Sequence, residues 1–100
     1  MKRVFISQPM NGKSDEEIIF ERSKAVANVQ RLVNGNIEVI DTLYVDFCSE
    51  AKPLEYLARS IADLAKADIA YFVKGWENAR GCKIEYECAS KYGIKCILED

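Results

Sequence analysis

The amino-acid sequence predicts an α/β protein in which helices cover both faces of a parallel β-sheet. Short apolar runs alternate with longer segments of helical periodicity, in the order β-α-β-α-β-α-β. Right-handed crossovers between such strands place them parallel in one sheet. The junctions that follow the strands are polar and contain glycine or aromatic residues, which predicts a ligand crevice at the carboxyl edge of the sheet.

The composition is that of one folded domain spanning residues 1–100. Hydrophobic residues make up 49% and charged residues 30%, and the net charge of −2 gives no basic surface for a polynucleotide. No apolar run approaches the roughly 20 residues that span a bilayer, and Met1-Lys2-Arg3 leads into a short strand rather than a signal sequence. We expect a cytoplasmic protein with no polynucleotide or membrane partner and, because so small a core limits stability, a homo-oligomer.

The cysteine and histidine content restricts the possible chemistry. The four cysteines form no C-x-x-C pair, and the chain has no histidine to complete a zinc site. We therefore expect no metal and no cofactor, and interpret Cys48, Cys82, Cys88 and Cys96 as reduced, small hydrophobic residues. Acid–base chemistry near neutral pH must then come from carboxylates, tyrosines, lysines or the substrate itself.

The sequence of the first half of the chain predicts a strand, one long helix and a second strand, in this order. Lys2 to Ser7 is the first strand, and Gln8 to Gly12 is a tight polar loop. A capping box at Ser14-Asp15-Glu16-Glu17 starts a helix that stops at Asn34-Gly35, and Ile37 to Ile40 follows as the second strand. The expected core stripe of this helix comprises Ile18, Ile19, Ala25, Val26, Val29, Leu32 and Val33.

The second half predicts two helices and two strands. Asp41 to Lys52 has no clear period and is interpreted as a long loop that folds over a site. Pro53 begins a helix whose apolar face, flanked by Tyr56, Ser60 and Asp63, comprises Leu54, Leu57, Ala58, Ile61, Leu64 and Ala65. The remaining elements are a strand from Asp68 to Val73, a helix from about Gly81 to Tyr92 and a strand from Lys95 to Leu98.

Glu85 is the most informative residue of the third helix. At helical spacing it shares a face with small or apolar neighbours, namely Gly81, Cys82, Cys88, Ala89 and Tyr92. A carboxylate inside such a stripe needs either a partner or a role. In the first turn of its helix, Glu85 would point at the crevice from beside backbone N–H groups and the positive end of the helix dipole.

The chain resembles the small bacterial and phage domain family of unknown function called DUF4406. The residues that carry this resemblance are Val4 to Gly12, Asp68 to Phe72, and Gly75 to Glu85 together with Ala89. That family in turn resembles the nucleoside 2-deoxyribosyltransferase superfamily, which includes 2′-deoxynucleoside 5′-monophosphate N-glycosidases. The shared pattern G-x-x-x-E-x-x-x-A matches Gly81, Glu85 and Ala89.

The resemblance implies both a fold and an activity. The fold is flavodoxin-like (Rossmann-like), a three-layer α/β/α arrangement with a four-stranded parallel sheet in the order 2-1-3-4. In the superfamily's enzymes the glutamate attacks C1′ of the deoxyribose to form a covalent glycosyl-enzyme, and an aspartate assists departure of the base, which is chemically like a retaining glycosidase. Glu85 would be the nucleophile. The aspartate's position holds Ser60, which leaves Asp63, Asp68 or Asp41 as substitutes, and we take Asp63 forward.

The same resemblance indicates substrate-binding residues. Ser7, Met10 and Gly12 resemble the superfamily's substrate loop, although a plain strand-to-helix turn would use them equally well. Trp76 either stacks on a base or sugar, caps the core or lies at a subunit interface. Asn78, Arg80 and Gly81 complete the candidate loop, although a solvated charge is the simpler interpretation of Arg80. Ala79 occupies the position of a phosphate-binding serine in some relatives.

Three hypotheses of different classes follow. The first is an enzyme that breaks or exchanges the N-glycosidic bond of a nucleoside or nucleotide through Glu85. The second is a sensor that keeps the crevice for a nucleotide-type or ADP-ribose-type ligand without turnover, which Ser60 and Ala79 favour. The third is a small interaction domain of a mobile element, with Trp76 and its neighbours as the interface.

Overall fold

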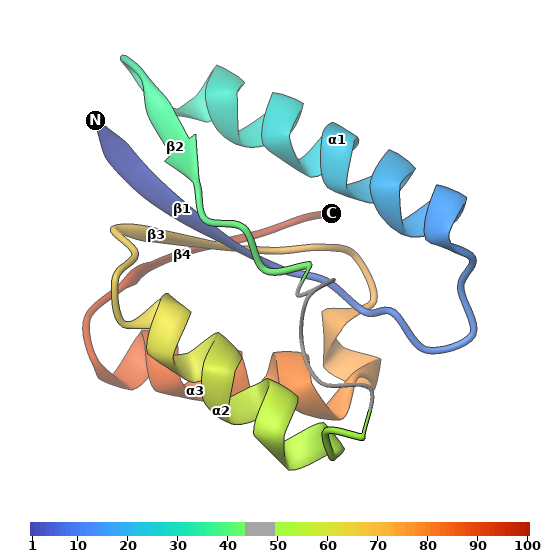
Figure 1. Cartoon of the computed structure of the whole chain (residues 1–100). Helices are drawn as coiled ribbons and strands as arrows, with labels where there is room; N and C mark the ends of the chain where they lie inside the picture. The colour runs from blue at the N-terminus through green and yellow to red at the C-terminus, as the bar shows by residue number, and fades with distance from the viewer. Residues whose placement is uncertain (44–49) are drawn as a thin grey trace.

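A computed structural model describes residues 1–43 and 50–100 and contains a four-stranded parallel sheet (Figure 1). The strands are β1 (Lys2–Ser7), β2 (Ile37–Val39), β3 (Ile69–Phe72) and β4 (Lys95–Leu98). They lie in the order β2-β1-β3-β4, with β1 between β2 and β3. The predicted flavodoxin-like arrangement and its strand order are confirmed.

Three α-helices form the outer layers. Helix α1 (Asp15–Leu32) lies on one face of the sheet, whereas α2 (Pro53–Leu64) and α3 (Arg80–Lys91) lie together on the other (Figure 1). None of the helices in the two described ranges has the length and apolarity needed to cross a bilayer. The expected cytoplasmic location stays a prediction.

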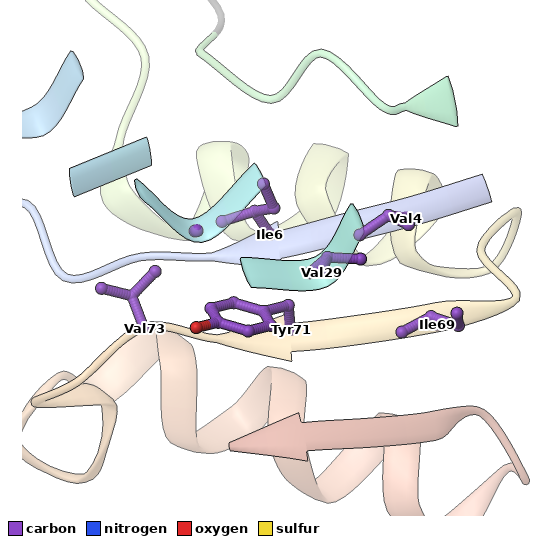
Figure 2. Packing of buried hydrophobic residues seen from close by; sticks show 7 residues of the cluster. Val4, Ile6, Val29, Ile69, Tyr71 and Val73 are labelled. Carbon is purple, nitrogen blue, oxygen red and sulfur yellow. The ribbon is translucent and has the colours of Figure 1, made fainter. Parts of the chain in front are cut away.

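The two central strands are buried on both faces, so alternate residues enter different cores. Val4, Ile6, Ile69, Tyr71 and Val73 pack with Ala25 and Val29 of α1, as Figure 2 shows for the labelled members. Phe5, Ala70 and Phe72 pack on the opposite face with Leu64 of α2 and Ala89 of α3. Ser7 has the same parity as Phe5, and its side chain therefore points toward α2 and α3.

Helix α1 begins as predicted but buries a narrower stripe. Ser14 and Glu17 form the expected capping box, and Val29 lies in the core. The prediction that Ile19 and Leu32 are core residues is wrong, because their exposed fractions are 57% and 65%. Ile19 lies one residue beyond Ile18 along the helix, a rotation of about 100° that turns it away from the sheet.

Helix α2 is rotated slightly from the orientation that its apolar residues predict. Leu64 is buried as expected, but Leu54 is 73% exposed and Ala58 also faces solvent. Ser60, expected at the border of the apolar face, is buried against the site described below. Residues 44–49, which form half of the predicted loop and include Cys48, lie outside the described residues.

The connection from β3 to α3 turns sharply at Gly75. Its φ of 94° lies in the left-handed region, which a residue with a Cβ adopts only at a cost. A short 3₁₀ turn, η1 (Trp76–Asn78), follows, and α3 begins at Arg80. The glycine therefore lets the chain leave the sheet and start α3 within a few residues. As a result, Glu85 of α3 lies beside Ser7 at the carboxyl end of β1.

Candidate active site

Three side chains from three elements meet at the carboxyl end of β1. Ser7 is the last residue of β1, Ser60 lies in α2 and Glu85 lies in α3. The Ser7 hydroxyl donates to Glu85 Oε1 over 2.6 Å, and the Ser60 hydroxyl donates to Glu85 Oε2, also over 2.6 Å. We call this group the serine–glutamate cluster. It connects the sheet and both helices of one layer.

Glu85 is a buried carboxylate whose direct partners are neutral. Only 7% of the residue is exposed, and both serines are as deeply buried. Burial raises the pKa of Glu85 above its ordinary value, while the hydrogen bonds from Ser60 and then Ser7 act in the opposite direction. Burial prevails, so the fold favours the protonated form more than water does. Such a perturbed carboxyl group is a frequent property of functional sites.

The two hydroxyls also determine how the carboxylate can react. A carboxylate has about four lone-pair positions on its two oxygens, and one donor on each oxygen leaves further lone pairs available. The hydrogen bonds hold the group in a fixed orientation, which reduces the entropy lost when an electrophile is positioned. The arrangement can therefore present an oriented oxygen nucleophile or bind a donor-bearing ligand.

Cys82 lies one turn before Glu85 and contacts the same cluster. Its thiol is buried, and its pKa is raised to about 11, mainly by burial. A hydrogen bond with Ser7 lowers this pKa, whereas the negative charge of Glu85 raises it. Cys82 is thus an unreactive thiol at neutral pH. The described cysteines Cys82, Cys88 and Cys96 are all free, with Cys88 and Cys96 half-buried.

The start of α3 differs from the prediction by one residue. The helix begins at Arg80 rather than about Gly81, which makes Glu85 its sixth residue and places it in the second turn. The helix dipole acts mainly within the first turn, so it contributes less to Glu85 than expected. Tyr92, predicted to share the stripe, lies beyond the last helical residue and is exposed.

Trp76 packs into an aromatic cluster beside the site. Its ring centroid lies 5.6 Å from that of Phe72 and 4.6 Å from that of Tyr86, and the residue is half-buried. Phe72 and Tyr86 meet edge to face at 5.3 Å. Of the three predicted roles, the geometry shows that Trp76 caps the core, while its exposed part stays available to a ligand.

The other predicted binding residues lie in the loop after β1 and in the segment from η1 to the start of α3. Met10 and Gly12 are exposed in the loop after β1, and Gly12 has a φ of 76°. Asn78 and Arg80 are exposed, and Gly81 lies against Leu57 of α2. Of the predicted set, the structure brings Ser7 into direct contact with Glu85.

The three candidate aspartates occupy different positions. Asp63 forms an ion pair with Lys66, with 3.5 Å between Oδ1 and Nζ. Asp68 precedes β3 at the amino edge of the sheet, where it accepts a hydrogen bond from the Arg3 backbone N–H, and Asp41 accepts one from the backbone N–H of Leu43. Asp68 therefore lies at the opposite end of the strands from the serine–glutamate cluster. The ion pair with Lys66 does not connect Asp63 to Glu85, and the role of Asp63 as the acid stays a prediction.

Ser60 is the site residue that helix periodicity misplaced. The pattern put it at the edge of the apolar face, and only the resemblance to the superfamily, whose enzymes carry an aspartate at this position, indicated a special position. Helix periodicity does not show that a small polar residue is buried, because its burial depends on a hydrogen-bond partner from another element. Among the described residues, no group of three or more histidine, cysteine, aspartate or glutamate side chains could hold a metal ion.

Two described cavities lie on the opposite layer, along α1. One, of about 310 Å³, is lined by Glu17, Phe20, Glu21, Lys24, Lys74 and Glu99. The second, of about 440 Å³, continues from Lys24 toward Leu32 and Leu98. Neither cavity includes Glu85 among its lining residues.

The sequence profile of one family, described as "Domain of unknown function (DUF4406)", matches residues 2–98. The chain belongs to the DUF4406 family. No curated protein and no solved structure shows significant similarity to it. The DUF4406 match covers every strand and helix of the fold, including all members of the serine–glutamate cluster.

Proposed function

We propose that this DUF4406 domain breaks or exchanges the N-glycosidic bond of a deoxynucleoside or its 5′-monophosphate, with Glu85 as the nucleophile. The observation that carries the proposal is the buried Glu85 carboxylate, held on both oxygens by serine hydroxyls at the carboxyl end of β1. The resemblance to nucleoside 2-deoxyribosyltransferases supports the same residue. A single small-molecule substrate, without cofactor or metal, suffices for this chemistry.

The proposed reaction has two displacements. A Glu85 oxygen forms a bond to C1′ as the C1′–N bond to the base breaks, and the bonding electron pair leaves with the base, which takes up a proton. Water or an acceptor base then attacks C1′ and releases the carboxylate. Ser7 and Ser60 orient Glu85, and Asp63 is the candidate proton donor to the departing base.

The raised pKa of Glu85 has two opposite effects on its role as the nucleophile. A more basic carboxylate is a stronger nucleophile, but the protonated form does not attack. The reaction rate is therefore predicted to rise with pH through the pKa of Glu85, while the departing base still needs its proton. A rate maximum between these two requirements is the expected pH profile.

The test is to incubate the protein with deoxynucleosides and their 5′-monophosphates, with and without an acceptor base, and to measure free base. Glu85→Gln removes the nucleophilic oxygen and is expected to abolish base release. Glu87→Gln is the matched control, because Glu87 lies on the same helix but is exposed and paired with Lys91. Full activity of Glu85→Gln, or base release from no substrate at all, contradicts the proposal.

A second candidate function is ligand sensing without turnover. It is favoured by Ser60, since a hydroxyl next to Glu85 binds but is a poor proton donor to a leaving group. A sensor would show a higher melting temperature with a nucleotide and no base release. A melting temperature that no nucleotide changes would count against it.

A further inference from the structure

Helix α1 exposes a stripe that the proposed function does not use. Its members are Glu16, Phe20, Ser23, Lys24, Ala27 and Arg31, which recur every three or four residues and all face solvent. We call this set the α1 outward stripe. Phe20 is 71% exposed, although α1 buries other apolar residues against the sheet. An aromatic side chain in the middle of a polar helix face is a typical interface anchor.

The charges of α1 are divided along its length. The first two turns carry Asp15, Glu16, Glu17 and Glu21, whereas the outward side of the second half carries Lys24 and Arg31. Glu16 makes no ion pair within the described ranges, and the Arg31 guanidinium donates to Asn28 of the same helix. One end of the stripe is therefore acidic and the other basic.

The α1 outward stripe is complementary to itself when one copy is reversed. Glu16 lies seven residues before Ser23, and Arg31 lies seven residues after Lys24. Phe20 lies three residues before Ser23, and Ala27 lies three residues after Lys24. A two-fold axis between Ser23 and Lys24 thus places acid opposite base and the largest side chain opposite the smallest, twice in each interface.

We propose that a second copy of this chain covers the α1 outward stripe, forming a two-fold dimer of antiparallel α1 helices. Glu16 of each copy meets Arg31 of the other, and Phe20 of each copy packs over Ala27 of the other. Ala27 permits the close helix approach that such packing needs, about 8–10 Å between axes. The face beside Phe20 is hollowed by the cavity of about 310 Å³, which leaves room for side chains of the second helix.

The small contact area of the α1 outward stripe indicates a weak dimer. An 18-residue helix is about 27 Å long, so the contact is at the small end of stable interfaces. The dimer should therefore dissociate at low concentration. A second copy on α1 does not cover the candidate active site, because α2 and α3 lie across the sheet from α1 (Figure 1).

Sedimentation velocity of the full chain tests the proposal over about 1–500 μM. The expected result is a shift from the 11.3 kDa chain mass toward twice that mass as concentration rises. Phe20→Asp should raise the dissociation constant at least about 30-fold, as expected for an interface hot spot. Leu54→Asp is the matched control, because Leu54 is equally exposed but lies on α2, and its dimer should persist.

Charge reversal tests the antiparallel register. Arg31→Glu and Glu16→Arg should each weaken the dimer, whereas the double variant should restore it, because the pair is regenerated with opposite signs. Far-UV circular dichroism at each concentration confirms that every variant is folded. A wild-type monomer over the whole range, an unchanged dimer in Phe20→Asp, or a folded double variant that stays monomeric overturns the proposal.

Discussion

Removing the Ser60 hydroxyl tests whether the serine–glutamate cluster stabilises a charged carboxylate. In Ser60→Ala, Glu85 Oε2 loses a 2.6 Å hydrogen bond inside a buried site. A hydrogen bond to a charged group contributes about 1.5–3 kcal/mol, whereas one to a neutral group contributes about 0.5–1.5 kcal/mol. While Glu85 is charged, the variant should therefore lose about 1.5–3 kcal/mol, which lowers the melting temperature by about 6 °C or more.

The pH dependence of this loss follows from the protonation state of Glu85. Burial raises the folded-state pKa of Glu85 above its unfolded value, so the free energy of unfolding falls as pH rises through that interval. Ser60→Ala removes a contact that lowers this pKa, and the interval becomes wider. The difference between wild type and variant should consequently be smaller at about pH 4 than at about pH 8.

Urea denaturation at both pH values measures the difference by linear extrapolation. Ser90→Ala is the control, since its exposed hydroxyl donates only to the Glu87 carbonyl, and it should change stability by less than about 0.5 kcal/mol. If Ser60→Ala lowers the free energy of unfolding by the same amount at the two pH values, Glu85 carries the same charge at both. The predicted titration of Glu85 between these pH values would then be wrong.

The remaining predictions concern the core and the other perturbed groups. The Tyr71 phenol, whose pKa burial raises to about 12, should stay protonated in a spectrophotometric titration until well above pH 10, and an ordinary titration would contradict its placement. The Cys82 thiol, with its pKa raised to about 11, should react with iodoacetamide far more slowly in the folded than in the unfolded protein, which peptide mass spectrometry can follow. Ile6→Ala should lower the free energy of unfolding by about 2–5 kcal/mol, whereas Ile19→Ala should change it by less than about 0.5 kcal/mol; similar losses would show that Ile19 is a core residue after all.

The strands could be predicted from the sequence because local patterns determine them, whereas the resemblance to the superfamily implied their order in the sheet. The apolar run from Val4 to Ile6 is typical of a strand buried on both faces, and the capping box at Ser14 sets the start of α1. The exposure of Ile19 and Leu32 could not be predicted in this way. Periodicity assigns an apolar face to a helix, but the neighbouring layer decides how much of it is covered, and among the described helices α1 alone contributes to the core on this side of the sheet.

The sequence pattern predicted Glu85 as a site residue, but it did not predict that Ser60 contacts Glu85. Glu85 stood out because a carboxylate interrupts a small, apolar stripe, whereas Ser60 had no local signal of its own. The Ser60 contact depends on how α2 packs against α3, which follows from the tertiary fold rather than from either helix. Residues 44–49, predicted to fold over the site, lie outside the described part of the chain.

Trapping the glycosyl-enzyme tests directly whether Glu85 is the nucleophile. The protein is quenched in acid during turnover of a deoxynucleoside, digested and examined by peptide mass spectrometry. The peptide containing Glu85 should gain the mass of one deoxyribosyl group, and the gain should be absent in Glu85→Gln but present in Glu87→Gln. Base release with an adduct on another residue, or an adduct that persists in Glu85→Gln, would contradict this role of Glu85.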